Sequence, residues 1–283
     1  LESNSFKLTA PFSASQLYDE YKVKLESIQK HIKDGDTYQI NYSIRFTAKY
    51  TGSTWSAYKK IREKCPTPFS AYISTDEGAI SSHSPERFVS LINGQIETRP
   101  IKGTRPRNSE HQKDMRAIES LKSSEKDRSE NLMIVDLLRN DIGKISVIGS
   151  VKVPELMVVE TYPNVHHLVS SITGILRDDI GVSDLICATF PGGSITGAPK
   201  ISAMQIINNL EGSPRSIYCG SILYIDSRGN MDSSITIRTL LLENGNVHCW
   251  GGGGIVAESV THEEYEEILA KVGPLMNALA SEL

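Results

Sequence analysis

The stretch FSAYISTDEGAISSHSPERFVSLINGQIETR, residues 69–99, decides the fold class. Short runs rich in β-branched and aromatic residues alternate in it with turn sequences, namely Asp76-Glu77-Gly78 and Asn93-Gly94. Tight turns of this kind join antiparallel neighbours. We therefore expect strands at residues 69–74, 79–83, 87–92 and 95–99. Ser84-Pro85-Glu86 interrupts this meander, which places Glu86 at a kink or bulge.

A basic stretch, Arg99-Pro-Ile-Lys-Gly-Thr-Arg-Pro-Arg107, follows the meander directly. Two prolines restrict its backbone and Gly103 frees it, so it is expected to be a shaped loop. Lys102 stands beside Gly103, where the missing side chain would leave room for a ligand. The alternative is a solvated basic loop without a function.

Patterns elsewhere in the chain predict helices joined to further strands. Helices are expected at residues 13–34, 53–65, 110–121, 125–139 and 183–189, from Pro199 and from Thr261, and strands at 217–225, 233–242 and 247–250. Strands cluster in runs without regular strand–helix alternation. This predicts an α+β fold of large antiparallel or mixed sheets packed with helices, as one domain over residues 1–283.

Residues 38–47 alternate between apolar and polar side chains, which predicts a strand with two different faces. The polar face begins with Gln39, Asn41 and Ser43. It faces either solvent or a site, and the alternation alone favours solvent.

Composition excludes several classes of protein. The net charge of −4 and pI near 6.0 argue against a nucleic-acid partner. No apolar run reaches the ~18 residues of a membrane span. The four cysteines are far apart, which predicts buried reduced thiols in a cytoplasmic protein. Leu1 is not an initiator methionine, so we expect a fragment or a processed chain.

Two predicted helices carry carboxylates three residues apart. Asp127 and Glu130 share one face of the first helix, and Glu264 and Glu267 share one face of the last. If the helices meet, four carboxylates without histidine or cysteine suit Mg²⁺. The alternatives are solvated faces and, for Thr261 and Glu264, a capping box.

The glycine-rich stretches do not match nucleotide-binding motifs. In residues 193–200 no lysine directly follows Gly197, and residues 251–254 lack the Gly-x-Gly-x-x-Gly spacing. Both could present backbone N–H groups to a small carboxylate. His167 is by default a packed histidine, whereas Arg238, expected within a strand, requires an anion from the protein or a ligand.

Taken together, the motifs resemble the chorismate-utilising enzymes, which include anthranilate, aminodeoxychorismate, isochorismate and salicylate synthases. The matching segments are residues 84–88, 99–107, 127–131, 165–168, 191–200, 237–238 and 252–256, with 264–271 after them. Two positions imply the subgroup. Isochorismate and salicylate synthases have a water-activating lysine where this chain has Gln39, which implies use of ammonia. Anthranilate synthases usually have alanine at Lys102, whereas lysine there resembles aminodeoxychorismate synthase component I.

The resemblance implies amination of chorismate to 4-amino-4-deoxychorismate, for 4-aminobenzoate and folate synthesis. Glu86 would protonate the departing hydroxyl, and Lys102 would form a covalent adduct at ring carbon C2 before ammonia adds at C4. His167 would orient the ring or handle a proton. Glu130 and Glu267 would bind Mg²⁺ directly, with Asp127 and Glu264 acting through water.

The remaining residues carried over by the resemblance bind substrate. They are Arg238, Tyr218, Gly252, Gly253, Gly254, Lys271, Thr104 and Gln39. Ammonia would come from a glutamine amidotransferase subunit (component II), since no such site is recognisable here. The family also implies further chain before Leu1. The alternatives are an anthranilate or isochorismate synthase, or a non-catalytic member that binds chorismate.

Overall fold

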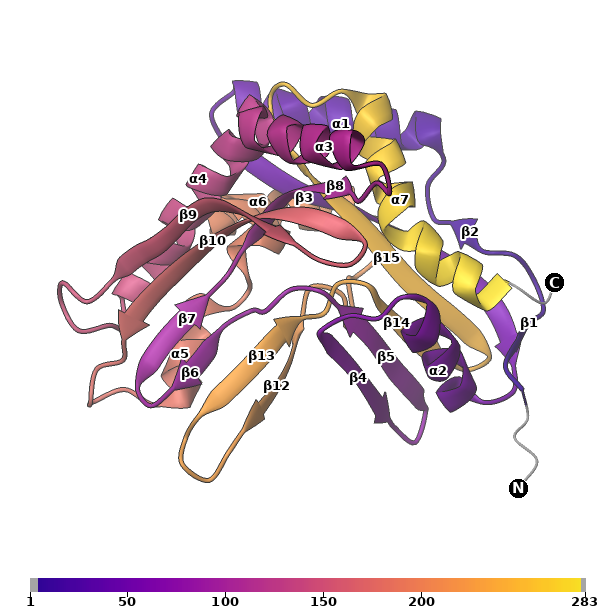
Figure 1. Cartoon of the computed structure of the whole chain (residues 1–283). Helices are drawn as coiled ribbons and strands as arrows, with labels where there is room; N and C mark the ends of the chain where they lie inside the picture. The colour runs from indigo at the N-terminus through magenta and orange to yellow at the C-terminus, as the bar shows by residue number, and fades with distance from the viewer. Residues whose placement is uncertain (1–4, 281–283) are drawn as a thin grey trace. The chain divides into compact units, whose positions relative to one another are not determined.

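The computed structural model describes residues 5–280, and the chain divides into two compact units (Figure 1). Of the described residues, unit 1 contains 5–85, 194–222 and 235–280, and unit 2 contains 86–193 and 223–234. Because each unit is assembled from separate segments, no single linker marks a boundary along the sequence. The prediction of one domain over residues 1–283, with more chain before it, stays a prediction.

Unit 1 is built on an antiparallel sheet with the strand order β1-β3-β15-β14-β5-β4, in which β2 and β11 also pair with β3. Its strands are β1 (Lys7–Leu8), β2 (Ser13–Ala14), β3 (Gln39–Thr51), β4 (Phe69–Ser74), β5 (Gly78–Ser84), β11 (Gly197–Ala198), β14 (Thr239–Glu243) and β15 (Asn246–Ile255). The longest ladder joins β3 to β15, from Lys49–Asn246 to Ile40–Ile255. This ladder forms the centre of the sheet.

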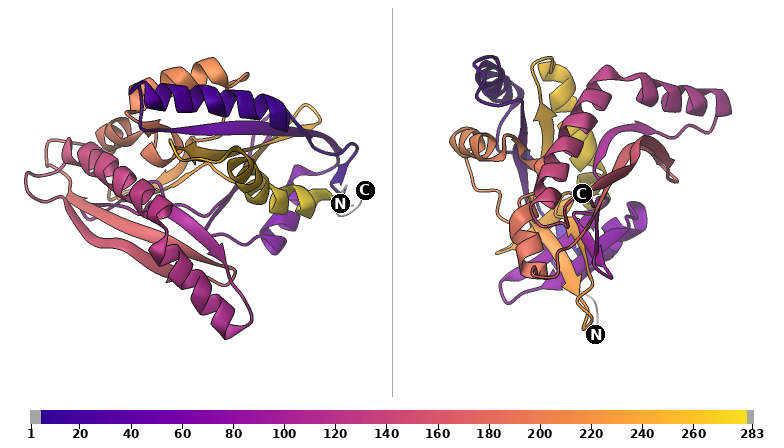
Figure 2. Two further views of the ribbon diagram at one scale, coloured as in Figure 1. Left: turned by 90° about the horizontal axis from the view of Figure 1, so that it is seen from above. Right: turned by 90° about the vertical axis from the view of Figure 1, so that its left-hand side faces the viewer.

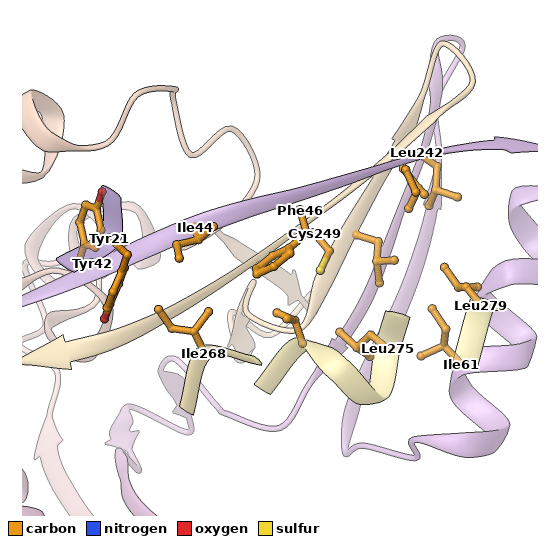
Figure 3. Close-up of a cluster of buried hydrophobic side chains, with 14 of the residues drawn as sticks. Tyr21, Tyr42, Ile44, Phe46, Ile61, Leu242, Cys249, Ile268, Leu275 and Leu279 are labelled. Carbon is orange, nitrogen blue, oxygen red and sulfur yellow. The ribbon is translucent and has the colours of Figure 1, made fainter. Parts of the chain in front are cut away.

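Four helices pack on this sheet: α1 (Tyr18–Lys33), α2 (Thr54–Lys64), α6 (Lys200–Leu210) and α7 (Thr261–Ala280). Helix α1 buries Tyr21, Leu25 and Ile28 at helical spacing and ends before Gly35, whose φ is +85°. These side chains join Ile44 of β3 and Ile268 of α7 in one core, part of which is drawn in Figure 3. Each fully buried large apolar side chain contributes about 1.5–3 kcal/mol.

Unit 2 has its own antiparallel sheet, in the order β12-β13-β6-β7-β10-β8, with β9 paired to β10. Its strands are β6 (Ser90–Ile92), β7 (Gln95–Thr98), β8 (Ile101–Pro106), β9 (Lys152–Thr161), β10 (Val165–Ile175), β12 (Ser221–Ile225) and β13 (Met231–Ile235). Its helices are α3 (His111–Ser123), α4 (Glu125–Gly143) and α5 (Val182–Thr189). Helices α3 and α4 lie along β8, β9 and β10 (Figure 2).

The α+β fold with antiparallel sheets is confirmed, and so are most of the predicted elements. The expected strand at residues 69–74 and the helix from Thr261 begin where the sequence placed them. Glu86 lies in the interruption between β5 and β6, as expected. Within residues 5–280, no helix combines the length and the hydropathy needed to cross a membrane.

Five local predictions differ from the structure. Ser13–Ala14 are strand, not helix, because they pair with β3. The basic stretch forms edge strand β8 instead of a loop, and the glycines at 251–254 lie within β15. The expected strand 233–242 is broken at Arg238, whose φ is +51°. The Cys187 side chain is exposed, whereas buried thiols were expected.

Candidate functional site

Glu86, the predicted general acid, is buried in unit 2. Its residue is 7% exposed, and the Ile101 N–H points at its carboxylate at 3.5 Å. The neighbouring Arg87 forms an isolated bridge with Ser234, which fixes the backbone of the interruption. A carboxyl group that acts as an acid near neutral pH requires burial of this kind.

The arginines of the basic stretch are all paired with carboxylates. Arg99 bonds Glu155 and Glu160, Arg105 bonds Asp127 at 3.0 Å, and Arg107 bonds Asp114 at 3.0 Å. Their charges are therefore matched within unit 2 and serve its architecture. Lys102 differs from them, because among residues 5–280 it makes no hydrogen bond or ion pair, and its side chain is only partly exposed.

Gly103 does not leave room for a ligand, which corrects the sequence prediction. Its φ is +82°, and a Cβ atom built on it would lie 2.8 Å from both Asp127 Cγ and Leu121 Cδ1. The space beside this glycine is filled by helices α3 and α4. The ladder between β8 and β10 also shifts register between Thr104 and Ile101. Lys102 thus lies at an irregular point of the strand, a common place for a side chain to be redirected.

His167 and Thr104 face each other across that ladder. The Thr104 hydroxyl and His167 Nδ1 are 2.8 Å apart, and the Tyr162 ring lies 5.5 Å from the imidazole. The half-exposed His167 is therefore held by a hydroxyl on the same strand as Lys102. These contacts fix the orientation of the imidazole, and the expected role of His167 toward the substrate ring or a proton stays a prediction.

Asp127 and Glu130 lie in the first two turns of α4. Ser124 caps the helix by accepting the Asp127 N–H at 3.3 Å, and both acidic residues are partly buried. Neither is a fully solvated side chain, which was the alternative reading.

A buried network behind His167 was not predicted from the sequence. His166 Nε2 lies 3.0 Å from Asp114 Oδ1 and its Nδ1 lies 2.9 Å from the Thr161 hydroxyl. Hydrogen bonds from Arg107 and the Asn108 N–H hold the pKa of Asp114 well below its usual range. The only sequence signal was a second histidine in an apolar strand pattern.

In unit 1, the glycine run of β15 permits close contact on both faces of the sheet. A Cβ atom on Gly251 would lie 2.8 Å from Val272 of α7, and one on Gly253 would lie 3.2 Å from the Glu264 carboxylate. On the other face, Gly252 lies beneath the Tyr218 hydroxyl and Gly254 beneath the Gln39 amide. The ladder from β14 ends at Cys249, so it does not cover the edge of β15 along the glycines.

The polar face of β3 is buried, so the expectation of solvent was wrong. Gln39 is 0% and Asn41 is 7% exposed. Within the described chain, neither polar atom of the Gln39 amide has a hydrogen-bond partner, and Asn41 Oδ1 has none. Each buried polar group left without a partner costs about 1–3 kcal/mol of folding free energy, so these amides destabilise the folded chain.

A partly buried ion pair, also missed in the sequence, secures this part of β3. Glu211 accepts the Ser43 N–H and hydroxyl, both at 2.8 Å, and Arg215 binds Glu211 at 2.7 Å and donates to the Asn41 carbonyl. Between β11 and β2, where β3 lacks a strand neighbour, these side chains take its place. Arg215 also lies 5.8 Å from the Tyr218 ring. Tyr218 is buried, and burial raises its pKa well above the ordinary value.

The remaining predicted substrate-binding residues of unit 1 are Arg238 and, on α7, Lys271. The Arg238 carbonyl accepts the His83 N–H at 3.0 Å, at the break between β13 and β14. Lys271 donates to the Gly252 carbonyl at 2.9 Å and pairs with Glu267 at 2.6 Å. The resemblance assigns this ammonium to substrate, and in this structure it links α7 to the glycine run.

Glu264 is buried on α7, so it does not lie on a solvated face. Its carboxylate accepts the Ser259 hydroxyl at 2.7 Å, and Glu267 beside it is about half exposed. Considering residues 5–280, no three His, Cys, Asp or Glu side chains form a group that could hold a metal. The two predicted pairs contain only carboxylate oxygens, the donor type that Mg²⁺ prefers.

The comparisons with known proteins agree with the motifs. Residues 2–277 match the family described as chorismate binding enzyme, so this chain belongs to the chorismate binding enzymes. The family resemblance drawn from the motifs is confirmed.

Two individual members of the family are similar to this chain over nearly its whole length. The chain is 51% identical to aminodeoxychorismate synthase component 1 of Klebsiella aerogenes over 98% of its length, and 50% identical to that of Escherichia coli strain K12 over 97%. It covers 61% and 60% of those two proteins, so it spans about three fifths of their length.

Among solved structures, anthranilate synthase component I from Streptococcus pneumoniae TIGR4 has the same fold. The TM-score is 0.87 at 35% identity, over 95% of this chain and 60% of that one.

Proposed function

We propose that this chain aminates chorismate with ammonia to give 4-amino-4-deoxychorismate, as aminodeoxychorismate synthase component 1. The identity of 51% to such a protein over 98% of this chain carries the proposal. Lys102, in the sequence Pro-Ile-Lys-Gly-Thr, supports it because this residue distinguishes the subgroup in the resemblance.

The first step uses two residues of unit 2. The uncharged amine of Lys102 attacks C2 of chorismate, the ring double bonds shift, and the C4–O bond breaks. Glu86 gives its proton to the departing hydroxyl, which leaves as water. The buried carboxyl of Glu86 and the unpartnered amine of Lys102 suit these roles. His167, held by Thr104, orients the ring.

In the second step, ammonia forms a bond to C4, the double bonds return, and the C2–N bond breaks, which leaves Lys102 as an uncharged amine. The new ammonium group at C4 then gives one proton back to Glu86. The sum is chorismate plus ammonia giving aminodeoxychorismate plus water. Residues of unit 1 bind the substrate carboxylates: the Arg238 guanidinium, the Tyr218 hydroxyl, the N–H groups of Gly252, Gly253 and Gly254, and Lys271.

Mg²⁺ belongs to the proposal because the donor set fits it. Glu130 and Glu267 would hold the ion directly and Asp127 and Glu264 through water. When bound, it supplies positive charge that neutralises a substrate carboxylate. The words "component 1" in the relatives' names imply a second subunit. This subunit would be the glutamine amidotransferase that supplies ammonia, as the family resemblance implies.

The test is to incubate the chain with chorismate, Mg²⁺ and an ammonium salt, to separate the products by chromatography and to identify them by mass spectrometry. The proposal expects a product that becomes 4-aminobenzoate only after a lyase is added. Direct release of anthranilate, or formation of isochorismate, would replace it with the corresponding synthase. Chorismate binding without turnover would indicate a non-catalytic member of the family.

A further inference from the structure

Ser170 lies in the middle of strand β10 and connects it to β8, β9 and helix α4. The residue is 0% exposed. Its main-chain N–H donates to the Pro100 carbonyl, just before β8, at 3.3 Å. Its hydroxyl donates to Asn131 Oδ1 of α4 at 2.6 Å and accepts the Met157 N–H of β9 at 2.9 Å. One buried residue therefore holds β10 against two neighbouring strands and a helix.

The Ser170 hydroxyl stabilises a bulge in β9. The ladder between β9 and β10 shifts register between Val169 and Ser171, and Met157, at this shift, has a φ of +55°. Residues other than glycine rarely adopt this conformation, and it persists where surrounding groups hold it. The bond from the Met157 N–H to the Ser170 hydroxyl is one such restraint. Bulges and strained residues of this kind are frequent beside functional sites.

A second bulge lies on the other side of β10, in β8, and contains Lys102. Between the pairs His167–Thr104 and Val169–Ile101, β8 has one residue more than β10. The residue after Lys102 is a glycine with a φ of +82°, which is usual in a bulge. The direction of the Lys102 side chain therefore depends on how this irregular segment is held against β10.

The main chain that leads into the β8 bulge has few ladder bonds available to it. Proline has no N–H, so Pro100 accepts from Ser170 but cannot donate back, as an ordinary residue in an antiparallel pair would. The next N–H, that of Ile101, points at the Glu86 carboxylate at 3.5 Å. The segment before Lys102 is therefore held by Ser170 and by the proposed general acid.

Helix α4 supports the same region through two side chains. Asp127 and Asn131 are four residues apart, so they share a face of the helix. Asn131 binds Ser170, and Asp127 Cγ lies 2.8 Å from a Cβ atom built on the glycine of the β8 bulge. Asn131 is also 0% exposed. Buried polar groups bonded in this way specify one arrangement of strands against a helix.

We propose that Ser170 positions Lys102 for its attack on the substrate. Residues three apart in a strand project to opposite faces, so the Ser170 side chain lies on the face that packs against α4, and His167 lies on the other. Ser170 therefore acts through the main chain of β8 and is a positioning residue. This inference rests on the proposed function, in which Lys102 is the nucleophile. Ser170 was not among the residues carried over by the family resemblance.

The first test is Ser170→Ala, which removes the hydroxyl and keeps the main-chain N–H. Initial rates against chorismate, at saturating Mg²⁺ and ammonium, give kcat and KM separately. We expect kcat to fall about 10–100-fold, because displacement of a reacting group by about 1 Å has an effect of this size. The chorismate KM should stay within about twofold, since the substrate-binding groups of unit 1 are unchanged.

Two further variants separate the hydroxyl from the shape of the side chain. Ser170→Thr and Ser170→Val add the same methyl group and differ in whether the hydroxyl is kept, so crowding affects both equally. The kcat of Ser170→Thr should be at least about fivefold higher than that of Ser170→Val, which is the effect of about one hydrogen bond.

Ser150→Ala is the matched control, at the far end of β10. The Ser150 hydroxyl also joins two main-chain groups: it accepts the Ile175 N–H at 3.1 Å and donates to the Val147 carbonyl at 2.7 Å. Its loss should lower Tm and leave kcat and KM unchanged. The control shows what loss of a serine hydroxyl from this sheet does when β8 is not involved.

Amide hydrogen exchange measures the connection between Ser170 and β8 without reference to activity. In Ser170→Ala, the amides of residues 101–104 should exchange about tenfold faster than in the wild type, because this segment opens more easily. Ser150→Ala should leave their exchange unchanged. Peptides that cover residues 99–106, analysed by mass spectrometry, supply the measurement.

Unchanged exchange in Ser170→Ala, or faster exchange with a wild-type kcat, would overturn the inference. So would equal kcat values in Ser170→Thr and Ser170→Val, or an equal fall in kcat in Ser150→Ala. The proposed function is judged separately by the wild-type product. If the wild-type chain makes no aminated product, that function fails and the role of Lys102 fails with it, whatever the exchange rates are.

Discussion

The basic stretch that contains β8 and the face of β3 that packs against β15 differ in whether their polar side chains have bonding partners. In the basic stretch, residues 99–107, every arginine is bonded to a carboxylate of unit 2. On the face of β3 that packs against β15, the Gln39 amide and Asn41 Oδ1 are buried and have no hydrogen-bond partner within residues 5–280. Abundant charge in a motif is thus no guide to ligand binding. The groups available to a ligand are those that the fold leaves unsatisfied, and Lys102 is such a group within β8.

The two buried histidines repeat the contrast. His166 of unit 2 lies against the Asp114 carboxylate. His83 of unit 1 is stacked on Tyr58, and its Nε2 lies 2.9 Å from the Ser81 hydroxyl. Burial, with a smaller contribution from Arg62, lowers the pKa of His83 to about 4. Burial therefore keeps the His83 ring of unit 1 neutral, whereas His166 of unit 2 has the Asp114 carboxylate as a partner.

The largest effect is expected at Lys102 of β8, whose side chain has no hydrogen bond or ion pair within residues 5–280. Lys102→Ala removes the proposed nucleophile and should lower amination at least ~10³-fold, with loss of any adduct seen by intact mass. Lys113→Ala, which removes an exposed lysine paired with Glu110, is the matched control and should keep wild-type rates. Wild-type turnover in Lys102→Ala would rule out an obligatory lysine adduct.

Acid stability tests the contrast between the histidines. Since the folded-state pKa of His83 is lower than the unfolded value near 6.5, protonation favours unfolding. Its contribution to stability is complete above pH 6.5 and declines as pH falls towards 4, by at most about 3 kcal/mol.

Denaturant unfolding between pH 7 and 4 measures this slope, which should flatten in His83→Leu. His31→Asn, at a half-exposed histidine of α1, should leave it unchanged. An identical pH slope in His83→Leu would show that other groups cause the decline.

The acidic residues of α7 offer a smaller effect. Glu267→Gln should weaken the apparent Mg²⁺ affinity about 10–100-fold, because it removes a proposed ligand charge. Glu266→Gln changes the exposed neighbouring side chain and should not. Titration of the amination rate with Mg²⁺ distinguishes them, and equal metal dependence would mean that the ligand lies elsewhere.

The smallest effect concerns the glycine of β8. Gly103→Ala places a methyl group against Asp127 and Leu121 at positive φ and should cost about 2 kcal/mol. Gly94→Ala has a similar φ of +78° but open space around it, so it should cost only about 1 kcal/mol. Chemical denaturation measures both. Equal losses would show that φ alone requires glycine at 103.

Much of the secondary structure followed from local pattern. The meander at residues 69–99 and the helices expected from Ser53 and Thr261 were predicted because their turns, caps and periodicity lie within a few residues of one another. Errors arose where a distant segment decided the state. Ser13–Ala14 became strand through β3, and the basic stretch became strand through β10.

The sequence by itself determined the fold class, the family and the identity of the residues in its motifs, because these depend on residue type and spacing. Tertiary structure alone decided which polar groups are satisfied. The pairing of Arg99 and Arg105 with acids, the burial of Asn41, and the side chains that fill the space beside Gly103 all depend on residues far away in the chain. Hydrogen-bond satisfaction is a property of neighbours in space, and a residue's type does not specify those neighbours.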